Sequence, residues 1–160
     1  MKRPEEIIRL IEPRFSNRLL ASAPGGLHPH VQIRPAGLTD LCRFLKTEPE
    51  LRFDLLRCIA AVDWHQKNVI EISYDLMSIP FGHVFAVKLE LDRAHPEVES
   101  VSSVWPAACW HEREAFDLMG VLFRNLPDAR RIFMPEDWTG HPLRKDYQDL
   151  VVYHGLKVKP

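Results

Sequence analysis

Residues 105–120 read Trp-Pro-Ala-Ala-Cys-Trp-His-Glu-Arg-Glu-Ala-Phe-Asp-Leu-Met-Gly, and this stretch decides how the rest of the chain is interpreted. It predicts a single helix over residues 106–119. Pro106 suits the first helical position, where its missing N–H costs nothing. Gly120 suits the left-handed residue that ends a helix.

Charged side chains are crowded into the middle of this helix. A period of 3.6 residues places Glu112 and Arg113 on the same side as Cys109, Phe116 and Met119. A charge among apolar neighbours is costly unless it is paired or hydrogen-bonded, so Glu112 and Arg113 need partners. These come from another protein or from the chain's own tail, whose charged residues include Arg130, Arg131, Asp137, Arg144, Lys145 and Asp146.

The residues before this helix predict a sheet with helices packed on it. Apolar side chains recur at helical spacing over residues 4–11, where Pro13 is expected to end the helix, and over residues 38–46. Extended segments are expected over residues 18–21, 31–34, 53–62, 69–77 and 83–91. Residues 95–101 predict a polar linker or a helical turn.

The order of these strands follows from the short connections between them. Residues 53–62 are apolar on both faces, which is typical of a central strand. The connections 63–68 and 78–82 are too short for a parallel crossover, so they join antiparallel neighbours. We therefore expect an α+β fold, with a mainly antiparallel sheet covered on one face by helices.

The residues after Gly120 have no clear periodicity, and prolines interrupt them repeatedly. They are rich in Trp, Phe, Met and Arg, and these residue types are enriched in protein interfaces. This composition argues against simple disorder. We divide the chain into a body, residues 1–122, and a long irregular C-terminal arm, residues 123–160. We favour an arm that docks on partner proteins over one that packs only on its own domain.

Composition excludes several classes of function. The net charge is −1, with 21 basic and 22 acidic residues, so the chain is not an electrostatic binder of nucleic acid. No apolar run approaches the roughly 20 residues of a membrane helix, and we expect a soluble or peripheral protein. The three cysteines are widely spaced, which favours free buried thiols over an iron–sulfur cluster.

Motifs for catalysis are incomplete. His111-Glu112 invites comparison with the zinc-protease pattern H-E-x-x-H, but Ala115 stands where the second histidine ligand belongs. Cys109 and His111 diverge on a helix and do not form a nucleophile–base pair. We therefore expect no catalytic, cofactor-binding or metal-binding residue in this chain.

Three motifs resemble the signature of one family. They are residues 110–120, residues 130–138 (Arg-Arg-Ile-Phe-Met-Pro-Glu-Asp-Trp) and residues 140–147 (Gly-His-Pro-Leu-Arg-Lys-Asp-Tyr). Residues 44–56 and 62–64 also look like the family's middle portion. The family is the 30-kDa-type subunit, also called the C subunit, of respiratory complex I, the proton-pumping NADH:quinone oxidoreductase.

The resemblance implies a structural role in a large assembly. In that family the subunit itself binds no cofactor; FMN and iron–sulfur clusters are held by partner subunits. The expected partners are the large quinone-site subunit (the 49-kDa type, or D subunit) and the iron–sulfur subunits of the B and I types. The complex lies on the cytoplasmic side of the inner membrane, and this chain would contact the membrane only through the complex. An equivalent subunit of a membrane-bound hydrogenase or formate hydrogenlyase is the alternative.

The candidate residues are therefore structural and interface residues from the central helix and the arm. They are Glu112, Arg113, Glu114, Asp117, Arg130, Arg131, Pro135, Asp137, Trp138, His141, Arg144, Lys145, Asp146 and Tyr147.

Overall fold

The structure is a computed structural model, and it describes residues 1–158. The last two residues of the predicted arm lie outside the described residues. The helices are α1 (Pro4–Phe15), α2 (Leu38–Thr47) and α3 (Ala108–Met119). The strands are β1 (Leu19–Ala23), β2 (His30–Ile33), β3 (Leu55–Trp64), β4 (Val69–Met77), β5 (Val84–Asp92), β6 (Glu97–Glu99), β7 (Leu122–Arg124), β8 (Val152–Tyr153) and β9 (Leu156–Lys157).

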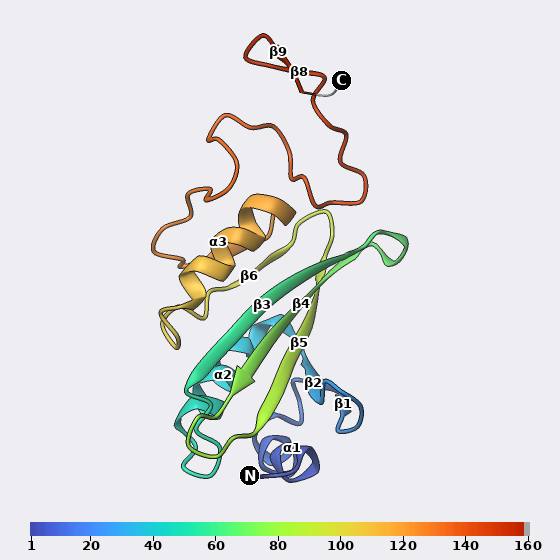
Figure 1. The fold of residues 1–160 in the computed structure, drawn as a ribbon. Coiled ribbons are helices and arrows are strands. Elements are labelled where there is room, and N and C mark those ends of the chain that lie inside the picture. The colour runs from blue at the N-terminus through green and yellow to red at the C-terminus, as the bar shows by residue number, and fades with distance from the viewer. Residues whose placement is uncertain (159–160) are drawn as a thin grey trace.

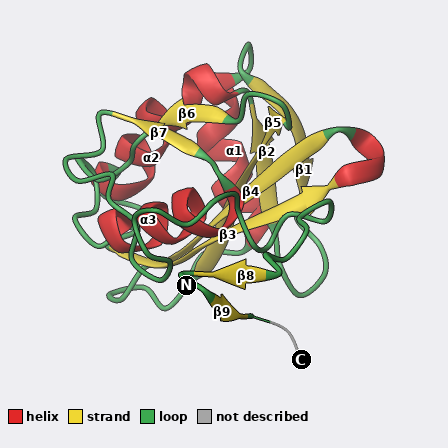
Figure 2. Cartoon of the chain, turned by 90° about the horizontal axis from the view of Figure 1, so that it is seen from above, coloured by secondary structure: helices red, strands yellow, loops and turns green. Residues whose placement is uncertain are grey.

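A five-stranded sheet in the order β1-β2-β5-β4-β3 forms the centre of the body (Figure 1). Neighbouring strands are antiparallel except β2 and β5, which are parallel. The helices lie on one side of this sheet (Figure 2). The predicted α+β fold with a mainly antiparallel sheet is therefore confirmed. The parallel pair was not foreseen, because β2 and β5 are far apart in the sequence.

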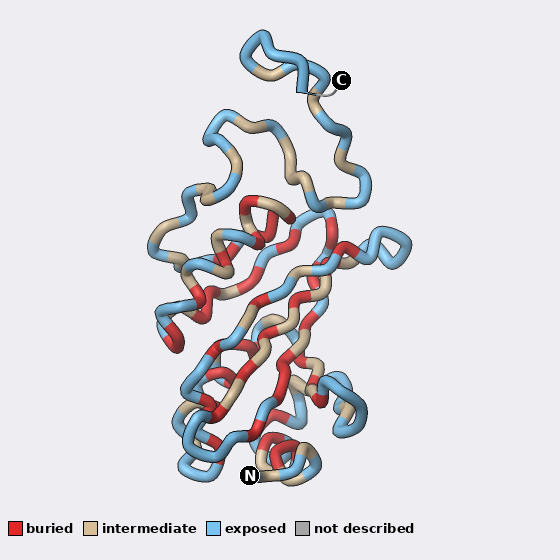
Figure 3. Tube along the Cα trace, in the orientation of Figure 1, coloured by how far each residue is buried: buried red, intermediate tan, exposed pale blue. Residues whose placement is uncertain are grey.

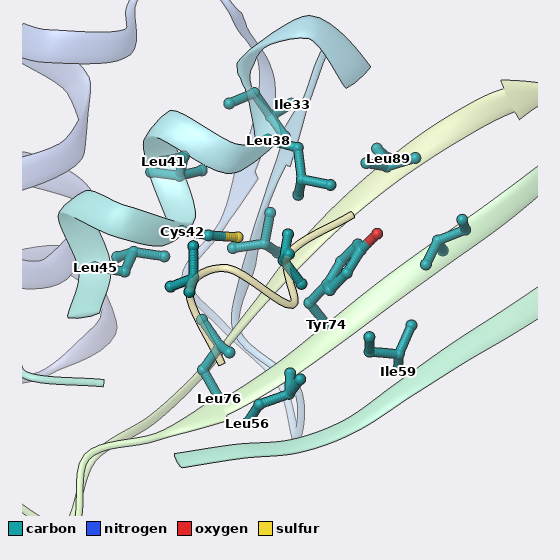
Figure 4. Packing of buried hydrophobic residues seen from close by; sticks show 14 of the residues in the cluster. Ile33, Leu38, Leu41, Cys42, Leu45, Leu56, Ile59, Tyr74, Leu76 and Leu89 are labelled. Atoms are coloured by element: carbon teal, nitrogen blue, oxygen red, sulfur yellow. The ribbon is translucent and has the colours of Figure 1, made fainter. Parts of the chain in front are cut away.

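The core forms where the alternating side chains of the sheet meet the helices. In β4, Ile70, Ile72, Tyr74 and Leu76 are buried, as the alternation predicted. Leu41, Cys42 and Leu45 of α2 and Tyr74 of β4 are buried between the helix and the sheet (Figure 4). A continuous apolar core therefore joins α1 and α2 to one face of the sheet.

Two predictions about the body are wrong. Strand β3 is an edge strand, not a central one. Its apolar composition reflects contact with α3, which packs against β3. Pro13 does not end α1, which continues to Phe15. A proline in the last turn removes a single helical hydrogen bond, and Phe15 packs on Phe44 with ring centroids 5.6 Å apart.

Residues predicted as a linker form a strand instead. Residues 97–99 of β6 pair in parallel with residues 122–124 of β7, and α3 is the crossover between them. Such a crossover supplies the length that a parallel pair requires. Three-residue strands are too short to show periodicity, which explains why the sequence did not reveal them. β7 spans the predicted body–arm boundary at 122/123, and that division stays a prediction.

Candidate partner-docking site at the end of α3

Helix α3 ends where the sequence predicted, and it begins two residues later. It spans Ala108–Met119, after a turn that contains Pro106. Gly120 adopts φ 70°, and its N–H donates to the Phe116 carbonyl at 2.9 Å. This left-handed cap redirects the chain into β7. The arm later returns and curls over this end of the helix (Figure 1).

Glu112 is buried and finds its partners before the helix, not in the tail. Its carboxylate accepts hydrogen bonds from Ser100 Oγ at 2.6 Å and from the Val101 N–H at 2.7 Å. Burial raises the pKa of Glu112 to about 7, although both hydrogen bonds act in the opposite direction. Of the two sources of partners that the sequence left open for Glu112, the structure uses neither.

Arg113 is held by the arm and is not paired with Glu112. Its Nε donates to the Arg130 carbonyl at 2.8 Å, and Nη2 donates to the Arg131 carbonyl at 3.2 Å. Nη1 lies 3.6 Å from the carboxylate of Asp128. Arg113 also stacks over the ring of Trp110, 5.4 Å from its centroid. The chain's own tail therefore supplies the partners of Arg113, which is one of the two sources that the sequence left open.

Asp117 is the strongest anchor of the arm. One of its oxygens accepts the N–H groups of residues 132, 133 and 134 at 3.1, 2.7 and 2.9 Å, and the other accepts Arg131 Nη1 at 2.7 Å. Burial alone raises the pKa of Asp117, but these four donors together outweigh it and hold the pKa below its ordinary value. Asp117 therefore fixes the turn at residues 132–134 against the helix.

The arm also satisfies the last carbonyl groups of α3. His141 Nδ1 donates to the Asp117 carbonyl at 3.0 Å, and the Leu143 N–H donates to the Leu118 carbonyl at 3.0 Å. Arg144 Nε donates to the Met119 carbonyl at 2.8 Å. The C-terminal end of a helix carries partial negative charge, so it favours cationic donors. His141 and Arg144 thus have a capping role that the sequence did not reveal.

A second anchor ties residues 145–146 to the edge of the sheet. Arg93 grips the buried carboxylate of Asp63 through Nε at 2.7 Å and Nη2 at 2.9 Å. It also contacts Asp146 at 2.5 and 3.1 Å, and the Lys145 N–H donates to Asp63 at 2.8 Å. The hydrogen bonds from Arg93 lower the pKa of Asp63 to about 2. Lys145 takes part through its backbone.

The remaining candidate residues stabilise the distal arm. Trp138 Nε1 donates to Tyr147 Oη at 3.0 Å, and its ring lies 5.0 Å from that of Tyr153. Asp137 accepts Tyr153 Oη and His154 Nε2, each at 2.7 Å. The remaining three candidates, Glu114, Arg130 and Pro135, are exposed. The Arg130 side chain donates to Asp128, and the Pro135 carbonyl accepts the Trp138 N–H.

Sequence reasoning missed several residues that complete these contacts. They are Asp63, Arg93, Ser100 and Val101. Asp63 lies in a motif that suggested the family, Val62-Asp63-Trp64, but its partner Arg93 belongs to no motif and follows Asp92 at the end of a strand. Nothing in the local pattern joins positions 30 residues apart. Only the fold brings β3, β5 and the arm together.

Beyond Leu126, which packs against the apolar core, the arm is held mainly by polar contacts. From residue 124 to residue 158 no residue is buried (Figure 3). Phe133 is 64% exposed and Leu143 is 57% exposed, and Trp110 on α3 is 65% exposed. Apolar side chains exposed to this extent are available for contact with a partner. These three residues are called the exposed apolar set below.

Neither a metal-binding cluster nor a membrane-spanning helix is found within residues 1–158. No group of three or more His, Cys, Asp and Glu side chains within this range is arranged to hold a metal ion. No helix of the same residues has the length and apolarity needed to cross a bilayer.

Comparison with known proteins identifies the family. A family model described as "Respiratory-chain NADH dehydrogenase, 30 Kd subunit" matches residues 31–150. The C subunit of NADH-quinone oxidoreductase from Chlorobium phaeobacteroides is 45% identical over 120 residues, which cover 74% of this chain and 72% of that protein. The corresponding subunit of Chloroherpeton thalassium is 40% identical over 156 residues, covering 96% of this chain and 65% of that protein.

Two solved structures share the fold. A chain of the membrane-bound sulfane sulfur reductase, an archaeal respiratory membrane complex, matches with a TM-score of 0.77 at 25% identity, covering 94% of this chain and 88% of that chain. The trypsin-resistant fragment (1–134) of Nqo5 matches with a TM-score of 0.64 at 23% identity, covering 79% of this chain and 99% of that chain. On the sequence matches, this chain belongs to the family of 30-kDa subunits, also called C subunits, of respiratory-chain NADH dehydrogenase.

Proposed function

We propose that this chain is a non-catalytic structural subunit of the peripheral arm of NADH:quinone oxidoreductase. Its family relatives are named as subunits of that complex, and the other subunits of the complex are its partners. The role of the chain is to hold neighbouring subunits in fixed positions. The complex as a whole transfers electrons from NADH through FMN and iron–sulfur clusters to quinone, coupled to proton translocation.

The anchored arm is the observation that carries this proposal. Asp117, Arg131 and Arg144 are engaged in holding the arm on α3, which leaves the exposed apolar set on the outside. Interface cores are enriched in Trp, Phe and Met and gain their affinity from such side chains. The same polar groups are committed to structural hydrogen bonds, which supports a structural role over catalysis.

The partners follow from the family and from the chemistry of the arm. We infer that the arm docks on the large quinone-site subunit, of the 49-kDa or D type, beside the iron–sulfur subunits of the B and I types. FMN and the iron–sulfur clusters belong to partner subunits, and this chain holds none of them. The chain then lies on the cytoplasmic side of the inner membrane and reaches the membrane only through the complex.

Purification of a tagged copy under mild detergent tests the proposal. We expect the tagged chain to recover other subunits and NADH:quinone activity. The same chain purified alone should show no flavin or iron–sulfur absorbance and no oxidation of NADH. Recovery of the chain alone, or turnover by the isolated chain that Glu112→Ala abolishes without loss of fold, would contradict the proposal.

One observation favours a second candidate. The likeness to a chain of an archaeal sulfane sulfur reductase means that this fold also serves a respiratory complex of a different name. The alternative from the family resemblance, an equivalent subunit of a membrane-bound hydrogenase or formate hydrogenlyase-type complex, is supported only in so far as the fold is also found in a respiratory complex of another kind. The purified complex separates the two: NADH oxidation with a flavoprotein subunit supports the first, and hydrogen oxidation with a nickel–iron subunit supports the second.

A further inference from the structure

The carboxyl group of Glu112 lies in the core and has no cation beside it. Its side chain has no solvent exposure, and its two hydrogen bonds come from neutral donors, Ser100 Oγ and the Val101 N–H. Among residues 1–158, no lysine, arginine or histidine side chain forms an ion pair with Glu112. An ionised carboxylate without a cation is costly in such a place, so burial favours the neutral form and raises the pKa of Glu112 to about 7.

Other elements packed around Glu112 supply no compensating charge. Tyr74 of β4 and Cys42 of α2 are wholly buried; burial first, and the charge of Glu112 second, raise the pKa of each, so both are neutral at ordinary pH. The ammonium group of Lys46, on α2, donates a hydrogen bond to the Val104 carbonyl. The hydroxyl group of Tyr74 has no hydrogen-bond partner among the described residues. The surroundings of Glu112 are thus polar in places but without a neutralising cation.

The neighbours of Glu112 on its own helix point elsewhere. Arg113 reaches the arm, and Glu114 is exposed. His111 is half-buried and makes no hydrogen bond to Glu112. Glu99 of β6 is engaged by Arg124 at 3.3 Å. The protonation of Glu112 is therefore decided by burial and by the two donors of residues 100–101.

Two serine hydroxyl groups connect Glu112 to the surface. Ser100 Oγ lies 2.6 Å from Glu112 Oε2 and 2.7 Å from Ser102 Oγ. Ser100 is buried, whereas Ser102 is half-buried, so the row of oxygens leads outward. The Ser102 N–H donates to Ser100 Oγ at 3.1 Å and fixes this turn.

This row of hydroxyl groups can serve either form of the carboxyl group. When Glu112 is ionised, Ser102 donates to Ser100 and Ser100 donates to the carboxylate. When Glu112 is neutral, its own O–H donates to Ser100 and Ser100 donates to Ser102. A hydroxyl group can act as donor and acceptor at once, so no polar atom of the row is left unpaired in either direction.

We propose that Glu112, Ser100 and Ser102 form a proton-exchange site, at which the buried carboxyl group gains and releases one proton through the two serine hydroxyls. On release, the proton of Glu112 passes to Ser100 Oγ as the proton of Ser100 passes to Ser102, and that of Ser102 passes to water. The net change is a carboxylate in the core and one hydronium ion in solvent. The ligand of this site is therefore the proton itself.

Carboxyl NMR of the full chain, labelled with carbon-13 at the glutamate carboxyl groups, tests the proposal. We expect one glutamate to titrate with a midpoint about 2 units above the others, which is the direction that burial gives. Glu112→Gln should remove this signal. The matched control is Glu114→Gln on the same helix, which should remove an ordinary signal and leave the high one in place.

The two serines separate the midpoint from the exchange path. Ser100→Ala removes a donor that favours the ionised form, so the midpoint should rise further. Ser102→Ala leaves the contact to Glu112 intact, so the midpoint should stay while proton exchange slows, which is seen as separate signals for the two forms. If Glu112→Gln does not fold, the upward shift in Ser100→Ala assigns the signal.

Three results would overturn the proposal. One is the absence of any glutamate with a raised midpoint in the full chain. The second is a high signal that persists in Glu112→Gln and does not move in Ser100→Ala. The third is an exchange rate unchanged in Ser102→Ala, which would remove the serine path.

Discussion

Replacement of Asp117 by alanine should release the arm from α3 without unfolding the body. The carboxylate of Asp117 holds Arg131 and the N–H groups of residues 132–134, four donors in all. A hydrogen bond to a charged group contributes about 1.5–3 kcal/mol. The values of the four hydrogen bonds cannot simply be added, because the freed turn lies on the surface and its N–H groups then form hydrogen bonds with water. We expect a loss of about 3 kcal/mol, limited by the detachment of the turn.

Hydrogen exchange of the isolated full chain measures this loss directly. A loss of about 3 kcal/mol corresponds to exchange of these three amides that is on the order of 100-fold faster. Amides of β4 and β5 serve as the internal control and should keep their protection. Asp117→Asn retains one acceptor oxygen and should give an intermediate value. Unchanged protection at residues 132–134 in Asp117→Ala would refute the reasoning.

The same anchor should weaken in acid. The pKa of Asp117 is lower in the folded chain than in the unfolded chain, so its contribution is present above the unfolded value. It is lost as the pH falls through the folded pKa. Protection of residues 132–134 should therefore fall in acid in the natural chain, after correction for intrinsic exchange. Asp117→Asn should show no such fall; an equal fall in both would contradict the assignment.

Three further predictions concern the body. Arg93→Ala leaves the buried carboxylate of Asp63 without its cation and should lower the free energy of unfolding in urea by about 3–5 kcal/mol. Asp146→Asn changes a half-exposed contact and should lower it by less than about 1 kcal/mol. Equal losses in the two variants would contradict the assignment of Asp63 and Arg93 as the main contact. Gly120→Ala forces an alanine into φ 70° with its Cβ 2.6 Å from the His141 ring, and should lower stability by about 1–3 kcal/mol; an unchanged melting temperature would count against it. The pKa of Glu112 is raised on folding, so stability should fall by about 3 kcal/mol between about pH 4.5 and 7, and Glu112→Gln should flatten this fall; an identical pH profile of the variant would refute it.

Local patterns in the sequence were enough for the elements with long, regular periodicity. The alternation over 69–77 predicted β4, and Pro106 with Gly120 bounded α3 within two residues. Such patterns repeat within a single element, so they can be recognised without knowledge of the fold. The same holds for the helical stripe of residues 38–46, which the structure places in α2.

Contacts between distant segments could not be predicted in this way. The sequence left open which residues partner Glu112, and the answer lies in a turn before α3. Residues 53–62 were predicted as a central strand because they are apolar on both faces. The contact of β3 with α3 accounts for this composition, and no periodicity within the strand can reveal that contact. The three-residue strands β6 and β7 depend on each other and on α3 as crossover, so neither is recognisable alone.

Truncation of the arm is the most direct test of its proposed role in docking. A tagged chain that ends after Leu126 keeps the five-stranded sheet, α3 and β7 but lacks every anchor contact of residues 128–147. Under mild detergent, the full-length tagged chain should recover the other subunits of the complex, and the shortened chain should be folded by circular dichroism yet recover none of them. Recovery of the complete complex by the shortened chain would contradict the account.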